Sequence, residues 1–128
     1  MNLSDRVESK VIDFFKDEFP KVEVIAMGNI LHNWGLEEKK LLLKKAYDAL
    51  PEDGVFIAIE HIIDADRRSN LPALIMSLHM MIETERGFDY STSDFESWIK
   101  EIGFAKAEFL ELNGPASAAI AYKKSANL

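Results

Sequence analysis

One stretch, VEVIAMGNILHNW at residues 22–34, constrains the fold more than any other part of the chain. Its first six residues are almost all apolar, which predicts a buried strand of a parallel sheet. Gly28 and Asn29 interrupt this run, and His32 and Trp34 follow just beyond the carboxyl end of the strand, where ligands bind in open α/β sheets. The stretch predicts either a functional site built on His32 or a structural histidine beside a core tryptophan.

The residues after this stretch predict a strand–helix–strand unit. Apolar side chains recur at helical spacing over residues 36–50, and a second apolar run over residues 55–59 ends at Glu60. Two apolar strands joined by a helix predict a parallel pair with a right-handed crossover. This part of the chain therefore predicts an α/β fold.

The remaining elements follow from turn and capping signals. The predicted elements are a polar loop over residues 61–70, a helix from Pro72 to about Arg86 that Gly87 ends, a helix that Ser91 caps and Gly103 ends, and strands over residues 107–112 and 118–122. The NGPA turn between the last two strands predicts an antiparallel hairpin.

The beginning of the chain is ambiguous. Apolar residues at helical spacing over residues 3–19 favour an amphipathic helix, whereas residues 7–15 also fit a short strand. Pro20 ends the segment in either case.

Composition excludes several classes of function. The 128 residues predict a single domain, residues 1–128, with a net charge of -7 and no run of more than two Lys or Arg, which argues against a nucleic-acid or anionic-membrane surface. There is no cysteine for a disulfide or a thiolate metal site. Neither a signal-peptide core nor a membrane-spanning run occurs, so we expect a cytoplasmic protein.

Three titratable residues follow predicted elements on one rim of the sheet. Glu60 and Asp89 are expected to lie near His32, and a carboxylate on one ring nitrogen makes a histidine a better base. The alternative is that both acids are solvated loop residues. The histidines lack the i, i+4 spacing of zinc-protease sites, so no metal site is expected. No two glycines are close enough for a dinucleotide-binding or P-loop fingerprint.

Five motifs together resemble the second half of S-adenosylmethionine-dependent O-methyltransferases of the plant caffeate and acetylserotonin type and their bacterial relatives. In chain order they are IDFFKDEFP, NILHNW, ALPEDGVFIAIEHIID, SLHMMIETERG and FDYSTSDFESWIKEIGF. The resemblance runs over residues 11–124 and implies a partial doubly wound, Rossmann-like class I methyltransferase sheet with helices on both faces.

The resemblance also implies roles for individual residues. His32 matches the general base that deprotonates the acceptor hydroxyl, Glu60 and Asp89 match the carboxylates that flank it, Met80 matches an acceptor-pocket methionine, and Asp13, Phe14 and Trp34 match residues that contact the cofactor S-adenosylmethionine. This sequence departs from the family pattern at Ile12, where a glycine is usual, at Asn33, where an aspartate is usual, and at Gly28, where plant members often carry a lysine.

The family's first strands, its Gly-rich loop and its dimerising helical domain have no counterpart in residues 1–10. We therefore expect a truncated catalytic domain with an incomplete cofactor site that is inactive alone. It is either the catalytic half of an O-methyltransferase for small-molecule hydroxyls, one half of a split enzyme, or a non-catalytic interaction module.

The same gap leaves the strand at residues 22–27 without one neighbour. An unpaired strand edge is prone to association. We expect residues 7–15 to pair there, or the chain to form a homodimer or to bind a partner chain that supplies the Gly-rich half.

Overall fold

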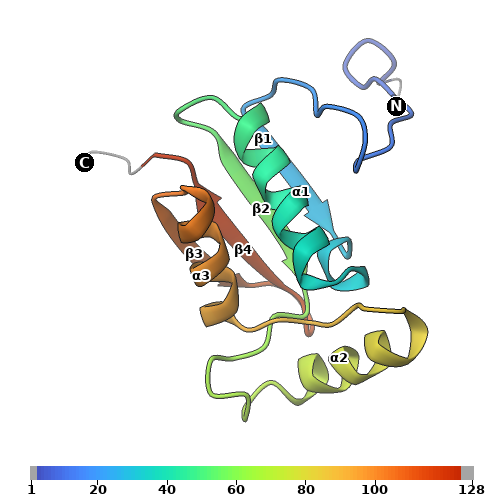
Figure 1. The fold of residues 1–128 in the computed structure, drawn as a ribbon, viewed down its shortest axis with the longest axis vertical. Coiled ribbons are helices and arrows are strands. Elements are labelled where there is room, and N and C mark those ends of the chain that lie inside the picture. Colours follow the sequence, from blue (N-terminus) through green and yellow to red (C-terminus); the bar gives the residue numbers. More distant parts are fainter. Residues whose placement is uncertain (1–2, 125–128) are drawn as a thin grey trace.

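The structure is a computed structural model that describes residues 3–124, and its centre is a four-stranded mixed sheet in the order β1-β2-β4-β3 (Figure 1). The strands are β1 (Val24–Gly28), β2 (Val55–Glu60), β3 (Lys106–Glu111) and β4 (Ser117–Tyr122). The described helices are α1 (Leu36–Ala49), α2 (Leu71–Glu83) and α3 (Thr92–Ile102), and η1 (Leu31–Asn33) is a short 3-10 helix. This is the α/β architecture that the sequence predicts.

Strand pairing confirms both predicted units. β1 and β2 run parallel, with Val24 opposite Val55, and α1 is the crossover between them. β3 and β4 form the predicted antiparallel hairpin, and β4 also pairs antiparallel with β2, with Ile57 opposite Ile120. β4, the last strand of the described residues, is therefore inserted between β2 and β3.

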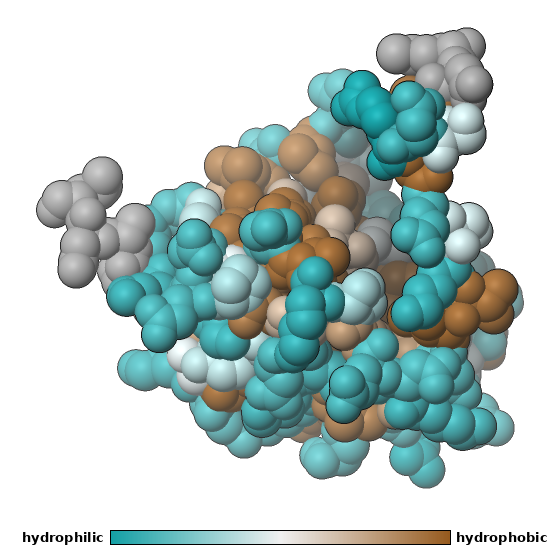
Figure 2. Space-filling view, turned by 90° about the horizontal axis from the view of Figure 1, so that it is seen from above, coloured by the Kyte–Doolittle hydropathy of each residue, from teal (hydrophilic) through white to brown (hydrophobic). Residues whose placement is uncertain are grey.

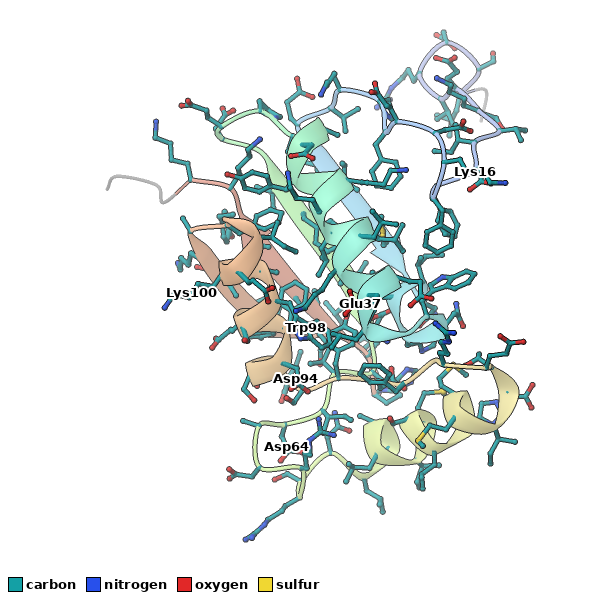
Figure 3. The ribbon with its side chains drawn as sticks, viewed as in Figure 1. Lys16, Glu37, Asp64, Asp94, Trp98 and Lys100 are labelled. Carbon is teal, nitrogen blue, oxygen red and sulfur yellow. The ribbon has the colours of Figure 1, made fainter. Side chains whose placement is uncertain are left out.

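One face of the sheet carries the core. α1 and α3 pack against each other on this face (Figure 1), where Phe56 and Ala58 of β2 are fully buried. Trp98 of α3 points into this layer, whereas Lys100 points away from it (Figure 3). Apolar residues on the inner side of each element thus build a single two-layer core.

The opposite face of the sheet disagrees with the prediction of helices on both faces. None of the described helices covers it, and Val24, Ile59 and Leu110 on that side are 38–54% exposed. Figure 2 shows hydrophobic side chains at the surface between the two termini. The prediction was wrong because α1 and α3, the described helices that pack on the sheet, both lie on the side of Phe56 and Ala58.

The helix that contains the methionines ends earlier than predicted. α2 begins at Leu71, with the Asn70 side chain accepting the Ala73 N–H, and it ends at Glu83 instead of Arg86. The Thr84 hydroxyl donates to the Met80 carbonyl at 2.7 Å, and Thr84 itself is extended. Thr84 therefore ends the helix, and the prediction that Gly87 does so was wrong.

The segment before Pro20 forms neither the helix nor the strand that the sequence allowed. The Asp13 carboxylate accepts the backbone N–H groups of Phe15 and Lys16, which folds a tight turn. Lys45 of α1 donates to the carbonyls of Phe14 and Asp17 and holds this turn against the helix. Local hydrogen bonding takes the place of a helix or a strand here. Residues 7–15 do not pair with β1, so the prediction that they do is wrong.

The outer edge of β1 has no strand partner among the described residues. No helix in residues 3–124 is long and apolar enough to span a membrane.

Candidate active site

The candidate site lies at the carboxyl ends of β1 and β2. Asn29 adopts a positive φ of 52° and turns the chain out of β1 into η1, which presents His32. The Asn33 side chain donates to the Asn29 carbonyl at 2.9 Å and closes this turn. Glu60 is the last residue of β2, so parallel pairing brings it beside η1 as the sequence predicts.

His32 and Asp89 lie side by side in the interior. His32 Nδ1 is 3.3 Å from Asp89 Oδ1, and both side chains are at most 8% exposed. Neither Asp89 oxygen accepts a hydrogen bond in the described structure, so this is a close contact without hydrogen-bond alignment, and it becomes an ion pair when His32 is protonated. The nearby Asp89 carboxylate raises the pKa of His32, against the opposing effect of burial.

Glu60 fixes the backbone of the histidine. Glu60 Oε1 accepts the His32 backbone N–H at 3.0 Å, and Glu60 Oε2 accepts the hydroxyl of Tyr90. Burial raises the pKa of Glu60, and burial beside this carboxylate raises the pKa of Tyr90 well above its usual value. Glu60 therefore fixes the backbone of the segment that carries His32, and it makes no hydrogen bond to the imidazole ring.

Asp89 is held by its own backbone. The Ser77 hydroxyl accepts the Asp89 N–H at 3.1 Å and donates to the Asp89 carbonyl at 3.3 Å. An isolated parallel bridge between Ile63 and Ser91 ties the same segment to the residues after β2. These contacts place the carboxylate in the interior without any side-chain hydrogen bond of its own.

A buried lysine completes the cluster. Lys39 of α1 is fully buried, its ammonium group donates to the Trp34 carbonyl, and it lies 3.6 Å from the centre of the Phe88 ring. Burial lowers its pKa from 10.5 to about 8, while the negative charges of Glu60 and Asp89 act in the opposite direction. Lys39 is thus a buried cation whose desolvation outweighs its attraction to the two buried carboxylates.

The three residues implied to contact the cofactor do not all gather at one place. The rings of Phe14 and Phe15 meet the edge of Trp34, with centroids 6.1 and 4.7 Å away. The Asp13 carboxylate is instead engaged by its own turn and by Lys16, whose ammonium lies 3.3 Å away. The backbone hydrogen bond from Phe15 lowers the pKa of Asp13.

An apolar groove of about 370 Å³ runs beside these rings along the open edge of β1. Its walls include Ile12, Phe14, Ile25, Met27 and Ile30. The groove and the aromatic edge suit the adenine of S-adenosylmethionine. None of the lining side chains supplies a polar group for its ribose or its carboxylate, so the residues present fit only part of the cofactor.

Met80 occupies the buried side of α2, the side that faces the body of the molecule and η1. Residues 3–124 contain no cluster of three or more His, Asp or Glu side chains that could hold a metal ion.

Sequence reasoning did not find Tyr90, Lys39 and Ser77 as parts of this cluster. Tyr90 adjoins Asp89 in the sequence, but nothing local indicates that its hydroxyl reaches Glu60. Lys39 follows Glu38 in an ordinary charged helix turn, and only its position on the apolar face of α1 signals burial. Helical spacing from Leu42, Leu43 and Ala46 could have revealed that position.

Comparison of this chain with known proteins identifies its relatives. Residues 1–105 match the family model described as an O-methyltransferase domain. The chain is 31% identical over 123 residues to the tetracenomycin polyketide synthesis 8-O-methyl transferase of Streptomyces glaucescens, covering 96% of this chain and 36% of that protein. It is 29% identical to acetylserotonin O-methyltransferase of Bos taurus, covering 93% of this chain and 34% of the relative.

Solved structures give the same relationship. Human N-acetylserotonin methyltransferase in complex with SAM superposes with a TM-score of 0.84 at 27% identity, covering 91% of this chain and 33% of that one. PigF with SAH superposes with a TM-score of 0.76 at 26% identity, covering 87% and 34%. The chain therefore spans about a third of the length of these relatives.

Proposed function

Because the chain belongs to the O-methyltransferase domain family, we propose that it is the catalytic half of an O-methyltransferase for a small-molecule hydroxyl, with His32 as general base. The observation that carries this proposal is the contact between His32 Nδ1 and the buried Asp89 carboxylate. A carboxylate at Nδ1 favours the tautomer with its proton on that nitrogen, which leaves Nε2 free to accept one.

The geometry supports proton transfer at Nε2. This nitrogen makes no hydrogen bond in the described structure and is not among the fully buried polar atoms, so an acceptor hydroxyl can approach it. Glu60 holds the His32 backbone and thereby fixes the position of the ring. When bound, S-adenosylmethionine supplies an activated methyl group. The work of this chain is to hold the hydroxyl, remove its proton through His32 and balance the resulting charge.

The substrate class follows from the relatives and the pocket. The two relatives described above are named for tetracenomycin polyketide synthesis and for acetylserotonin. Met80 lies on the buried side of α2, the helix that contacts η1, and an apolar side chain there suits an aromatic ring. We therefore assign the acceptor to phenols or enol-like hydroxyls on aromatic molecules.

A partner chain would supply the cofactor half. The six glycines of this sequence are too widely spaced for a Gly-rich phosphate or carboxylate loop, and the edge of β1 is open beside the partial cofactor groove. A strand of the partner would pair with Val24–Gly28 and bring the missing loop to Phe14 and Trp34. Because the cofactor half is missing, we expect the chain to be inactive alone. We also propose that it is a cytoplasmic protein.

Complementation tests this proposal. The segment of the tetracenomycin relative that has no counterpart in this chain is expressed separately and mixed with it, and methyl transfer from labelled cofactor to a panel of phenols is measured. Amide exchange in Val24–Gly28 reports whether the two chains bind. Binding together with methyl transfer supports a split catalytic half.

A non-catalytic interaction module is the alternative, favoured by the same open edge and by the uncovered sheet face. Slowed exchange in Val24–Gly28 without methyl transfer to any acceptor would favour this alternative over the catalytic proposal.

A further inference from the structure

Lys39 of α1 is buried among the residues of the candidate site, and the proposed proton transfer does not use it. The residue is 0% exposed, which is rare for a lysine, and burying its charge is unfavourable unless the ammonium group finds partners. An apolar side chain would fill the same position without this cost. The contacts of the ammonium group are therefore the observation that explains a lysine at this position.

On one side, the ammonium group of Lys39 holds the segment that carries His32. It donates a hydrogen bond to the carbonyl of Trp34, two residues after His32. This carbonyl precedes Gly35, the N-cap of α1, so the hydrogen bond joins η1 to the first turn of the helix. The Trp34 N–H donates to the Leu31 carbonyl at 3.1 Å, so both ends of this residue are held.

On the other side, the same ammonium group meets the segment that carries Asp89. It lies 3.6 Å from the centre of the Phe88 ring and 5.9 Å from the centre of the Tyr90 ring, the side chains that flank Asp89 in the sequence. A cation over the face of an aromatic ring is attracted by the ring, most strongly away from water. Figure 1 shows this segment, between α2 and α3, passing the end of α1 at which the helix begins.

The contact between His32 and Asp89 depends on how these two segments are placed. The imidazole nitrogen and the carboxylate oxygen are 3.3 Å apart without a hydrogen bond between them, so the pair does not fix its own geometry. Glu60 holds the backbone of His32, and Ser77 holds the backbone of Asp89, but each of these contacts fixes one segment alone. The side chain of Lys39 contacts both segments at once.

We propose that Lys39 is a positioning residue for the pair of His32 and Asp89: its ammonium group binds the Trp34 carbonyl and the Phe88 ring and thereby sets the distance between the imidazole and the carboxylate. This role rests on the proposed function in taking His32 as the general base. The placement of the pair can nevertheless be measured on this chain without methyl transfer.

The charge of Lys39 has a separate effect on His32. The titratable groups near the ammonium group are His32 on η1, Glu38 on α1, Glu60 on β2, and Asp89 and Tyr90 before α3. The contact with Asp89 raises the pKa of His32, whereas the positive charge of Lys39 lowers it. Removal of Lys39 therefore has two opposite effects on this pKa, because the loss of the charge raises it and separation from Asp89 lowers it.

A double-mutant cycle separates the two effects. NMR titration gives the pKa of the His32 ring in wild type, Asp89→Asn, Lys39→Met and the double variant. The charge of Lys39 is constant within each comparison, so its effect cancels and the cycle reports how closely Asp89 approaches the ring. We expect Asp89→Asn to shift the pKa in the Lys39→Met background by about half or less of its shift in wild type. An equal shift in both backgrounds would overturn the proposal.

Lys44→Met is the matched control, because it removes the same charge from a half-exposed position of the same helix. It is expected to leave the effect of Asp89→Asn unchanged, and an equal reduction there would overturn the proposal by pointing to a general disturbance of α1. Phe88→Leu removes the ring under the ammonium group and keeps the charge, so it serves if Lys39→Met does not fold. It is also expected to reduce the effect of Asp89→Asn, and a full effect would count against the positioning role.

Methyl transfer in the complemented complex is the second measurement. Lys39→Met is expected to lower kcat about tenfold or more and to leave the KM for the acceptor nearly unchanged, because a displaced base slows the chemical step without removing a binding contact. An unchanged kcat in a complex that His32→Gln inactivates would overturn the positioning role. If His32→Gln keeps the full rate while the cycle gives the expected result, the proposed base is wrong and the placement of the pair by Lys39 stands.

Discussion

Gly87 lies directly against the backbone of His32. A Cβ atom added at Gly87 would fall 2.5 Å from the His32 carbonyl oxygen and 2.3 Å from the Thr84 hydroxyl. The close approach of the two segments brings Asp89, two residues further on, to the imidazole ring. The glycine that the sequence suggested as a helix stop therefore acts as a spacer between two parts of the candidate site.

We predict that Gly87→Ala disturbs the site. Backbone atoms of His32 and Asn33 must move to admit the methyl group, and overpacking of this kind costs about 1–3 kcal/mol. Chemical denaturation measures the free energy of unfolding, and the NMR signals of the His32 ring report its displacement. Gly28→Ala is the control, because a Cβ at Gly28 meets nothing within 4 Å. Equal effects of the two substitutions would contradict the assignment.

We predict that His32 titrates above its ordinary pKa of 6.5 and that Asp89→Asn lowers this pKa, because the carboxylate at 3.3 Å is the main cause of the shift. A folded-state pKa above 6.5 means that the folded protein binds the proton more tightly than the unfolded chain. The stabilisation is thus fully present below pH 6.5 and is lost as pH rises through the folded-state pKa. NMR titration of the ring protons gives the pKa, and an unchanged value in Asp89→Asn would refute the pairing.

We predict that Lys39→Met stabilises the protein at neutral pH by about 1–3 kcal/mol, because burial of the ammonium lowers its pKa more than Glu60 and Asp89 raise it, so the charged form costs stability in the folded protein. The gain should shrink between pH 8 and 10.5, where the folded protein has already lost the Lys39 proton and the unfolded chain still holds it. Denaturation at several pH values compares the variant with wild type. Lys100→Met, at an exposed position of α3, should show no such trend.

We predict that His32→Gln removes most of the methyl transfer in a complemented complex. General-base catalysis is typically worth about 10²- to 10⁴-fold, and glutamine cannot accept the proton. Initial rates with saturating cofactor measure this, and His79→Gln, an exposed histidine on α2, serves as the control. A His32→Gln complex with the wild-type rate would exclude His32 as the base.

We predict that the 128-residue chain by itself binds S-adenosylmethionine weakly or not at all. The groove beside Phe14 and Trp34 offers apolar contacts for the adenine but no polar side chain for the rest of the molecule. Calorimetric titration decides the matter. One-to-one binding with micromolar affinity would show that other residues of this chain complete the site.

Much of the fold could be predicted because its signals are local. The apolar run that contains Val24–Gly28, the spacing within α1 and the NGPA turn each determine an element through a few neighbouring residues. The capping box of Ser91 and Asp94 fixes the first turn of α3 in the same way.

Other features could not be predicted because they depend on contacts between distant residues. The turn at Asp13 is held by Lys45, 28 to 31 positions away from the carbonyls that it binds, so no periodicity at the start of the chain encodes it. In the candidate site, the rim of His32, Glu60 and Asp89 follows from topology alone. The Tyr90–Glu60 hydrogen bond and the burial of Lys39 require knowledge of which faces meet.

The insertion of β4 between β2 and β3 determines when this molecule can fold during its synthesis. Val55 pairs with Tyr122, and β3 touches the sheet only through β4. While the ribosome is still making residues 106–116, β2 has an empty edge and β3 has no neighbour to join. Strand pairs so far apart in sequence form slowly, and unpaired edges favour aggregation meanwhile. The sheet is therefore completed only after Ser117–Tyr122 leave the ribosome. Loss of β4 would separate β3 from β2 and leave both strands without this neighbour.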